Sequence, residues 1–296
     1  MSFLAELKRV AGAVERGLDR LLAKPGASPE SPRLAEAMRY ATLGGGKRLR
    51  PFLLVESAGL FGVSEEQALP AATALECVHC YSLVHDDLPS MDDDAVRRGR
   101  PTLHIAFDEA TAILVGDALQ TLAFEVLSDP SAHPDPAIRA ELVFLLAKAA
   151  GWQGMAEGQA LDLSAERRGF GPAAIAALQA LKTGALFRFA CEGGAVLGRA
   201  TPSERQALVA YASAFGQAFQ LADDLLDAEG DAASLGKAVA KDAGLGKATL
   251  VARLGPDAAR KRLGALLHEA EAALAPFGDR AEVLRELARF IATRKI

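Results

Sequence analysis

The chain has 296 residues, of which 50% are hydrophobic, so it is long enough to bury a large core. Its 33 lysines and arginines against 38 aspartates and glutamates give a net charge of −5 at pH 7, which argues against general nucleic-acid binding. Three cysteines (Cys77, Cys80 and Cys191) are too few for a disulfide framework, so we expect a reducing, cytoplasmic environment.

Helical periodicity runs through nearly the whole sequence. It begins at residues 2–22, where apolar residues recur at spacings of three or four, and Ser31 is suited to cap a later helix. Similar patterns predict helices at 33–43, 48–61, 65–85, 107–127, 136–150, 172–197, 203–228, 256–274 and 280–293. Sustained strand alternation is not seen, and no stretch approaches the roughly 18 uncharged apolar residues of a membrane span. We therefore predict a single all-α domain over residues 1–296, with no membrane span.

A dense charge cluster follows the fourth of these helices. The segment HDDLPSMDDD (85–94) contains five aspartates, and three arginines follow at Arg97, Arg98 and Arg100. Because Pro89 cannot continue the helix comfortably, Asp86 and Asp87 should lie at its C-terminal end, where the helix dipole disfavours anions. Mutual repulsion adds to that cost, so the cluster predicts a strong cation nearby.

A second carboxylate cluster occurs in LADDLLDAEGD. Asp223 and Asp227 are four residues apart on one helical face, with Asp224 beside them. Either cluster alone could be a solvated helix face, but two clusters within apolar helices favour a metal site. Oxygen ligands without histidine suit a hard cation such as Mg²⁺, which typically bridges carboxylates to substrate phosphates.

Basic residues with glycine neighbours make up the third signal. In LGGGKRLRP (43–51), three glycines precede Lys47, Arg48 and Arg50, so backbone N–H groups and cations are offered to an anion, although the Walker pattern fails. The alternative is a basic surface loop. Arginines beside metal-binding aspartates nevertheless make a coherent diphosphate site.

These motifs, in this order, resemble the trans-polyprenyl diphosphate synthases, most closely the bacterial farnesyl diphosphate synthases. The resemblance covers GGGKRLRP, DDLPSMD, RRGRPT, GDALQTLAF, GQALDL, KTG, DDLLD, LGK and GKAT. It implies a helical bundle of the isoprenoid synthase type around a deep central cavity, with the aspartate motifs facing each other, and a homodimer. The implied reaction is head-to-tail condensation of isopentenyl diphosphate with an allylic diphosphate (dimethylallyl or geranyl), triggered by metal-assisted ionisation.

The resemblance also assigns roles to residues of this sequence. Magnesium, three ions with substrate bound, would be held by Asp86, Asp87, Asp92, Asp223, Asp224 and Asp227. The allylic diphosphate would be gripped by Arg97, Lys182, Lys237 and Lys247, and isopentenyl diphosphate by Lys47, Arg50, His79 and Arg98. Thr183 and Gln220 would direct dipoles at the carbocation, and Tyr81 with its neighbour Ser82 would limit the product to fifteen carbons.

Four alternatives bear on this interpretation. Geranylgeranyl diphosphate is the second candidate product, and a terpene cyclase would share the fold and the ionisation without needing a second diphosphate site. A ferritin-like di-iron bundle needs its Glu-x-x-His motif twice, whereas only Glu76-x-x-His79 matches here. A catalytically inactive relative would typically have lost one aspartate motif, and both are intact.

Overall fold

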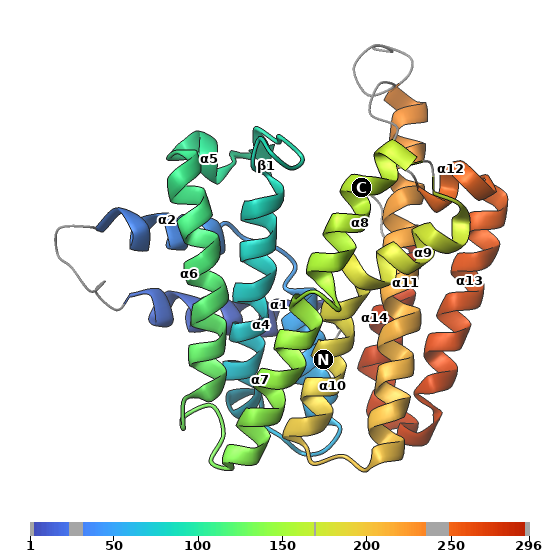
Figure 1. Cartoon of the computed structure of the whole chain (residues 1–296). Helices are drawn as coiled ribbons and strands as arrows, with labels where there is room; N and C mark the ends of the chain where they lie inside the picture. The colour runs from blue at the N-terminus through green and yellow to red at the C-terminus, as the bar shows by residue number, and fades with distance from the viewer. Residues whose placement is uncertain (1–2, 24–31, 169, 235–248, 294–296) are drawn as a thin grey trace. The chain divides into compact units, whose positions relative to one another are not determined.

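The computed structural model describes residues 3–23, 32–168, 170–234 and 249–293. Its architecture is helical, with one short hairpin in which Val96 pairs with Pro101 and Arg97 with Arg100. The elements are α1 (Phe3–Leu22), α2 (Pro32–Thr42), α3 (Leu49–Gly59), α4 (Glu65–Asp86), β1 (Val96–Arg97), β2 (Arg100–Pro101), α5 (Leu103–Ala106), α6 (Glu109–Ser128), α7 (Pro136–Ala150), α8 (Met155–Arg168), α9 (Pro172–Lys182), α10 (Gly184–Leu197), α11 (Pro202–Ser234), α12 (Leu250–Leu254), α13 (Pro256–Ala273), the 3-10 helix η1 (Ala275–Ala281) and α14 (Glu282–Thr293) (Figure 1). The predicted all-α class is confirmed.

The chain divides into two compact units. Unit 1 comprises residues 1–146 and 196–198, and unit 2 comprises residues 147–195 and 199–296. Helices α7 and α10 each contribute residues to both units. The expectation of one domain over the whole chain stays a prediction.

Unit 1 is organised around α4, which packs against α1, α2, α3 and α6. Residues 71–78 of α4 are all buried, as expected for a helix whose apolar side chains cover every face. Ser64 and Gln67 begin the helix with a reciprocal capping box, in which each side chain accepts a hydrogen bond from the other residue's backbone N–H. The helix ends at Asp86, just before Pro89, as the sequence predicted.

Helices α4 and α6 run side by side in unit 1 (Figure 1) and approach closely at Gly116. A Cβ atom at Gly116 would lie 1.9 Å from Nε2 of His85 on α4. The same Nε2 donates a hydrogen bond to the Ile113 carbonyl at 3.1 Å. The missing side chain at Gly116 therefore sets the position of the α4 end that carries Asp86.

Unit 2 is organised around the 33-residue α11, which packs against α9, α12, α13 and α14. Leu221 and Leu225 on α11 share a buried cluster with Val251, Ala259 and Leu266. Helices α8 and α9 meet backbone to backbone, because a Cβ atom at Gly158 would lie 2.1 Å from the Lys182 backbone nitrogen. This contact places the end of α9 against α8.

The structure differs from the predicted helices in several places. The predicted helix 172–197 is two helices, α9 and α10, which meet at Thr183 with a bend of 47°. The predicted helix 107–127 corresponds to α6, which is preceded by a separate short helix, α5. Helix α8 was not predicted. Helix α11, predicted over 203–228, continues to residue 234. Ser31, the expected cap, lies outside the described residues. Apolar periodicity alone cannot detect such breaks, because it continues across them.

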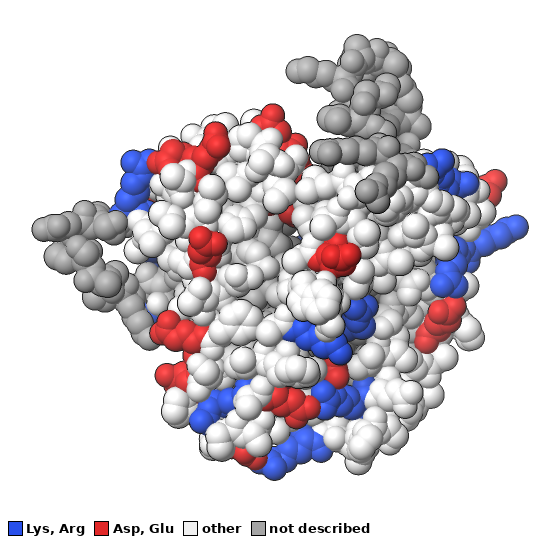
Figure 2. All heavy atoms as spheres, in the orientation of Figure 1, with Lys and Arg blue, Asp and Glu red and all other residues white. Residues whose placement is uncertain are grey.

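Among the described helices, α6 is long and apolar enough to cross a membrane, as are α9 and α10 if taken as one span. The apolar stretch of α6 is 33% buried and contains Asp117 and Glu125, and a core helix of a soluble protein meets the same criterion. On the face shown in Figure 2, acidic and basic side chains lie in small groups separated by uncharged surface.

Alanine substitutions at two glycines, Gly116 and Gly12, test the close approach of α4 and α6. Gly116→Ala should lower the free energy of unfolding by about 1–3 kcal/mol, because the new methyl group must displace His85. Gly12→Ala lies in the interior of α1, where the new methyl group meets only the flexible end of Arg16. This variant should raise the free energy of unfolding by about 0.5–1 kcal/mol. Denaturant unfolding of the two variants measures both changes. Equal effects of the same sign would contradict this account of Gly116.

Candidate active site

The first aspartate cluster folds back on itself at the end of α4. The backbone N–H of Asp92 donates to the Asp86 carbonyl at 2.9 Å, and that of Met91 donates to the Leu88 carbonyl at 2.8 Å. These bonds close a compact turn that brings Asp92 back to Asp86, and both residues are half-buried. Two carboxylates separated by five residues of sequence are thus neighbours along the backbone of one turn.

Asp87 in the same cluster has a different environment. Its side chain is 5% exposed, and its Oδ1 accepts a hydrogen bond of 2.7 Å from Nε of Arg97 on the β1–β2 hairpin. Burial raises the pKa of the Asp87 carboxyl, and the hydrogen bond from Arg97 opposes that shift. Asp87 therefore holds Arg97 in place beside the turn.

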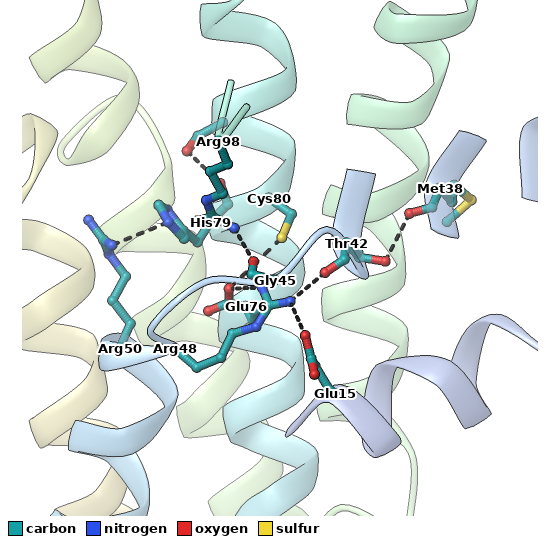
Figure 3. A network of polar contacts seen from close by, with 11 residues as sticks. Glu15, Met38, Thr42, Gly45, Arg48, Arg50, Glu76, His79, Cys80 and Arg98 are labelled. Carbon is teal, nitrogen blue, oxygen red and sulfur yellow. Dashed lines mark hydrogen bonds and ion pairs between the residues drawn. The ribbon is translucent and has the colours of Figure 1, made fainter. Parts of the chain in front are cut away.

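The glycine loop between α2 and α3 brings three of the predicted cations and ligands together (Figure 3). Arg98 donates to the Gly45 carbonyl, and a Cβ atom at Gly46 would lie 2.6 Å from Nη1 of Arg98, so glycine is needed for this approach. Nη1 of Arg50 lies 3.4 Å from Nε2 of His79. Lys47 is exposed on the same loop.

His79 is neutral in this arrangement. A guanidinium group can only donate, so Nε2 of His79 accepts from Arg50 and the ring proton is on Nδ1. Burial first, and then the charges of Arg50 and Arg98, hold the pKa of His79 well below its usual range. A neutral imidazole can therefore offer Nδ1–H to an anion among the surrounding arginines.

A cleft in unit 1 is formed by the end of α2, the last turns of α4 and the hairpin. It contains about 480 Å³ of empty space that is partly open to solvent, and its lining includes Tyr40, Asp87, Arg97, Arg98 and Arg100. Cys80 also lines the cleft, but burial raises the pKa of its thiol to about 12. The thiol therefore stays protonated, and the dominant chemistry of the cleft is cationic.

One cation of the glycine loop departs from the sequence analysis. Arg48 was grouped with Lys47 and Arg50 as an anion ligand, but its side chain is 1% exposed and pairs with the buried Glu76 at 2.5 Å (Figure 3). Glu76 and His79, three residues apart on α4, therefore contact Arg48 and Arg50 respectively. A glutamate within a buried helix was the signal that could have predicted this pair, because a buried charge requires a partner.

The second aspartate cluster lies on α11 in unit 2. Asp223 is half-buried and Asp227 is exposed, whereas Asp224 is buried. Oδ1 of Asp224 accepts from Nε2 of Gln220 at 2.9 Å, and Oδ2 accepts from Nε2 of Gln179 at 3.0 Å. Burial raises the pKa of the Asp224 carboxyl, and the two amides oppose the shift. As in the first cluster, the most buried aspartate is bonded to neighbouring side chains.

Gln220 connects this cluster to the break between α9 and α10. Its Oε1 accepts a hydrogen bond of 3.0 Å from the hydroxyl of Thr183, so the two predicted dipolar residues do meet. Gln179 was not predicted; a polar residue within the apolar stretch of α9 was the signal for it. Lys182, next to Thr183, pairs with Asp162 on α8 at 2.5 Å, and the predicted Lys237 and Lys247 lie outside the described residues.

Tyr81 occupies the contact between α4 and α6. It is buried, its ring centroid lies 5.9 Å from that of His85, and its hydroxyl interacts with Gln120 on α6. Burial raises the pKa of its hydroxyl. Ser82 instead donates to the His79 carbonyl at 2.9 Å, which directs its hydroxyl back along its own helix.

The donor chemistry of the accessible aspartates, those half-buried or exposed, fits a hard divalent cation. Asp86 and Asp92 on one turn, and Asp223 and Asp227 on one helical face, offer only carboxylate oxygens. Within the described part of the chain, no group of three or more His, Cys, Asp or Glu side chains is arranged to hold a metal ion. Such incomplete donor sets suit Mg²⁺, which shares its coordination with water and substrate phosphates.

Comparison with known proteins identifies the family. The family model described as polyprenyl synthetase matches residues 31–275. Farnesyl diphosphate synthases of Haemophilus influenzae and Escherichia coli are each 43% identical to the chain, over 99% of both lengths. The crystal structure of an apo FPP/GFPP synthase from Zymomonas mobilis is 47% identical, with a TM-score of 0.89 over 98% of this chain and 99% of that one. The chain therefore belongs to the polyprenyl synthetase family.

Proposed function

We propose that the protein condenses isopentenyl diphosphate head to tail with allylic diphosphates, giving mainly farnesyl diphosphate. The observation that carries this proposal is the set Arg50, His79 and Arg98, which offers an anion site in addition to the aspartate turn. A reaction that joins two diphosphates needs two anion sites, whereas a terpene cyclase needs one. The names of the relatives, farnesyl diphosphate synthase, support the same product.

The arginine and histidine set would bind isopentenyl diphosphate. Arg50 and Arg98 supply charge, and His79 supplies Nδ1–H without adding a third positive charge. The exposed Lys47 extends the set toward solvent. Because these residues carry no carboxylate, the second substrate would be held without competing for metal ions.

The allylic diphosphate would be bound through the accessible aspartates and Arg97. Divalent metal ions, which Asp86 with Asp92 and Asp223 with Asp227 would hold, would supply the positive charge that a departing diphosphate requires. Arg97 is kept beside the first pair by its bond to Asp87. Magnesium, the three ions, and the contributions of Asp87, Asp224, Lys182, Lys237 and Lys247 stay predictions.

Thr183 and Gln220 would face the carbocation with a fixed polarity. The Asp224 carboxylate can only accept, so Gln220 must turn its NH₂ group to Asp224 and its carbonyl oxygen to Thr183. The Thr183 hydroxyl then donates its hydrogen bond to Gln220, and the lone pairs of its oxygen remain available to a developing positive charge. Asp224 therefore orients the pair rather than reacting.

Two further expectations accompany this function. The homodimer stays a prediction. The cytoplasmic location also stays a prediction, and the three cysteines, which are free and buried, suit a reducing compartment.

A direct assay tests the function. Purified protein with Mg²⁺, labelled isopentenyl diphosphate and either dimethylallyl or geranyl diphosphate should give a fifteen-carbon alcohol as the main product after dephosphorylation. The products should be resolved beyond twenty carbons, because geranylgeranyl diphosphate is the alternative product and one relative is an FPP/GFPP synthase. Absence of condensation with both starters would exclude the proposed reaction.

The first site prediction concerns the accessible aspartates. Asp86→Ala and Asp223→Ala should each lower kcat by about 100-fold or more, because charge neutralisation at the leaving group is lost. Both variants should keep their helical circular dichroism. Asp93→Asn is the matched control: it removes one exposed charge at a left-handed backbone position that asparagine tolerates, and turnover should change little. Near-normal turnover of Asp86→Ala would refute the ligand assignment.

A second prediction separates the two substrate sites. Arg50→Ala should raise KM for isopentenyl diphosphate by about 10- to 100-fold, the cost of a charge-assisted hydrogen bond, with much less change for the allylic substrate. Arg33→Ala, an exposed arginine of α2, is the control and should change neither constant. Steady-state kinetics with each substrate varied in turn decide the matter. Equal increases for both substrates in Arg50→Ala would contradict the division into two sites.

A third prediction concerns product length. Tyr81→Ala opens space between α4 and α6 and should shift the product toward twenty carbons or more, if this side chain limits elongation. Tyr81→Phe keeps the ring and removes only the hydroxyl that interacts with Gln120, so its products should match those of the parent enzyme. Chromatography of the dephosphorylated products compares the three proteins. An unchanged distribution in Tyr81→Ala would show that Tyr81 is a packing residue alone.

A further inference from the structure

The glycine loop between α2 and α3 is anchored by a buried charged side chain, that of Arg48. Arg48 is the last residue before α3, and its side chain is 1% exposed. Its Nη1 donates to Oε1 of Glu76 at 2.5 Å, and the Glu76 side chain is 2% exposed. A buried ion pair is costly unless its geometry is well defined, so the fold holds this guanidinium in one position.

The same guanidinium closes the loop on itself. Nη2 of Arg48 donates to the carbonyl of Thr42 at 2.6 Å, and Thr42 is the last residue of α2. Carbonyls at a helix C-terminus lack intrahelical partners and attract cations. The side chain at the end of the loop is therefore bonded to the residue at its start, and the three glycines lie between these two anchors.

The backbone of Arg48 carries a cost that fits this role. Its φ of 50° and ψ of 41° lie in the left-handed region, which is uncommon for residues other than glycine. Three glycines lie just upstream, at positions 44–46, so the chain had a residue type suited to that conformation close by. An arginine at this position indicates that the side chain contributes more than the backbone strain costs.

The anchor also fixes the loop along α4. Glu76 and His79 are three residues apart and share one helical face, and Arg48 and Arg50 pair with them respectively (Figure 3). The buried pair lies directly beside the Arg50–His79 contact, so a shift of the first would move the second.

We propose that Arg48 and Glu76 are positioning residues for isopentenyl diphosphate: they hold the glycine loop in the register that places Arg50 against His79. This inference rests on the proposed function, because it takes that loop as the second diphosphate site. Neither side chain contacts the substrate in this account. A displacement of about 1 Å in such a site can lower activity by about 100-fold, so the anchor should affect binding without contact.

The test uses the paired variant Arg48→Met/Glu76→Met, because each single variant breaks the buried pair and can fail to fold. Arg48→Met leaves the buried Glu76 without its guanidinium, and Glu76→Met leaves the buried Arg48 with the longer ion pair to Glu15, at 3.4 Å. The paired variant removes both charges and should be more stable than either single variant in thermal unfolding. Its KM for isopentenyl diphosphate should rise about 10- to 100-fold, whereas KM for the allylic substrate should stay within about threefold of the parent value. Glu76→Gln keeps an oxygen acceptor for Arg48, so its KM for isopentenyl diphosphate should lie between those of the parent and the paired variant.

Hydrogen exchange provides a readout that does not depend on activity. Backbone amides of residues 43–50 should exchange at least about tenfold faster in the paired variant, with those of α6 unchanged. Leu127→Ala removes a fully buried side chain near the end of α6 and serves as a control for general destabilisation; its KM ratio should match that of the parent.

The outcomes separate this inference from the proposed function. Parental exchange at residues 43–50 in the paired variant, or faster exchange with an unchanged KM for isopentenyl diphosphate, would overturn the positioning role. A similar KM change in Leu127→Ala would overturn it as well. The second diphosphate site itself is judged by Arg50→Ala, whose result does not depend on Arg48 or Glu76.

Discussion

Buried charged groups require partners. In this protein their pairings determine the positions of the charged groups that remain accessible to solvent. Glu76 is paired with Arg48, Asp87 with Arg97, and Asp224 with two glutamine amides. Leaving any one of these carboxylates without a partner in a low-dielectric interior would cost several kcal/mol. Each pairing also fixes a neighbour that faces outward, so the buried contact provides the geometry and the exposed residue provides the chemistry.

The two aspartate clusters follow this rule in the same way, although they lie on different backbones. In the first, a turn after a helix C-terminus brings Asp92 to Asp86 while Asp87 turns inward. In the second, a continuous helix places Asp223 and Asp227 on one face and Asp224 on another. A cluster of like charges is tolerated in both because its most buried member is satisfied internally and the others remain accessible to water and cations.

Glycines provide the close approaches that helices with side chains would prevent. Gly116 lets His85 lie against α6, Gly158 lets α8 meet the backbone of α9, and Gly46 gives room to Arg98. At each position the absent Cβ atom admits a group next to a proposed functional residue. At the two helix–helix contacts, packing at ordinary distances of about 8–10 Å would move these groups apart. The glycines therefore contribute to the site although they carry no chemistry.

The helical class, the family, the reaction proposed and most of the candidate residues could be predicted from the amino-acid sequence, because apolar periodicity and ordered motifs are local properties of the chain. So could the end of α4 shortly before Pro89, since a proline acts on the residues next to it. Which side chain of each motif turns inward depends on the folded chain: Arg48 and Arg50 are two residues apart in one motif, yet one is buried on Glu76 and the other contacts His79. The bend at Thr183 and the role of Gln179 likewise depend on the folded chain. Such choices depend on partners that are distant in sequence, 28 residues away for Arg48 and 45 for Gln179, and no local pattern encodes them.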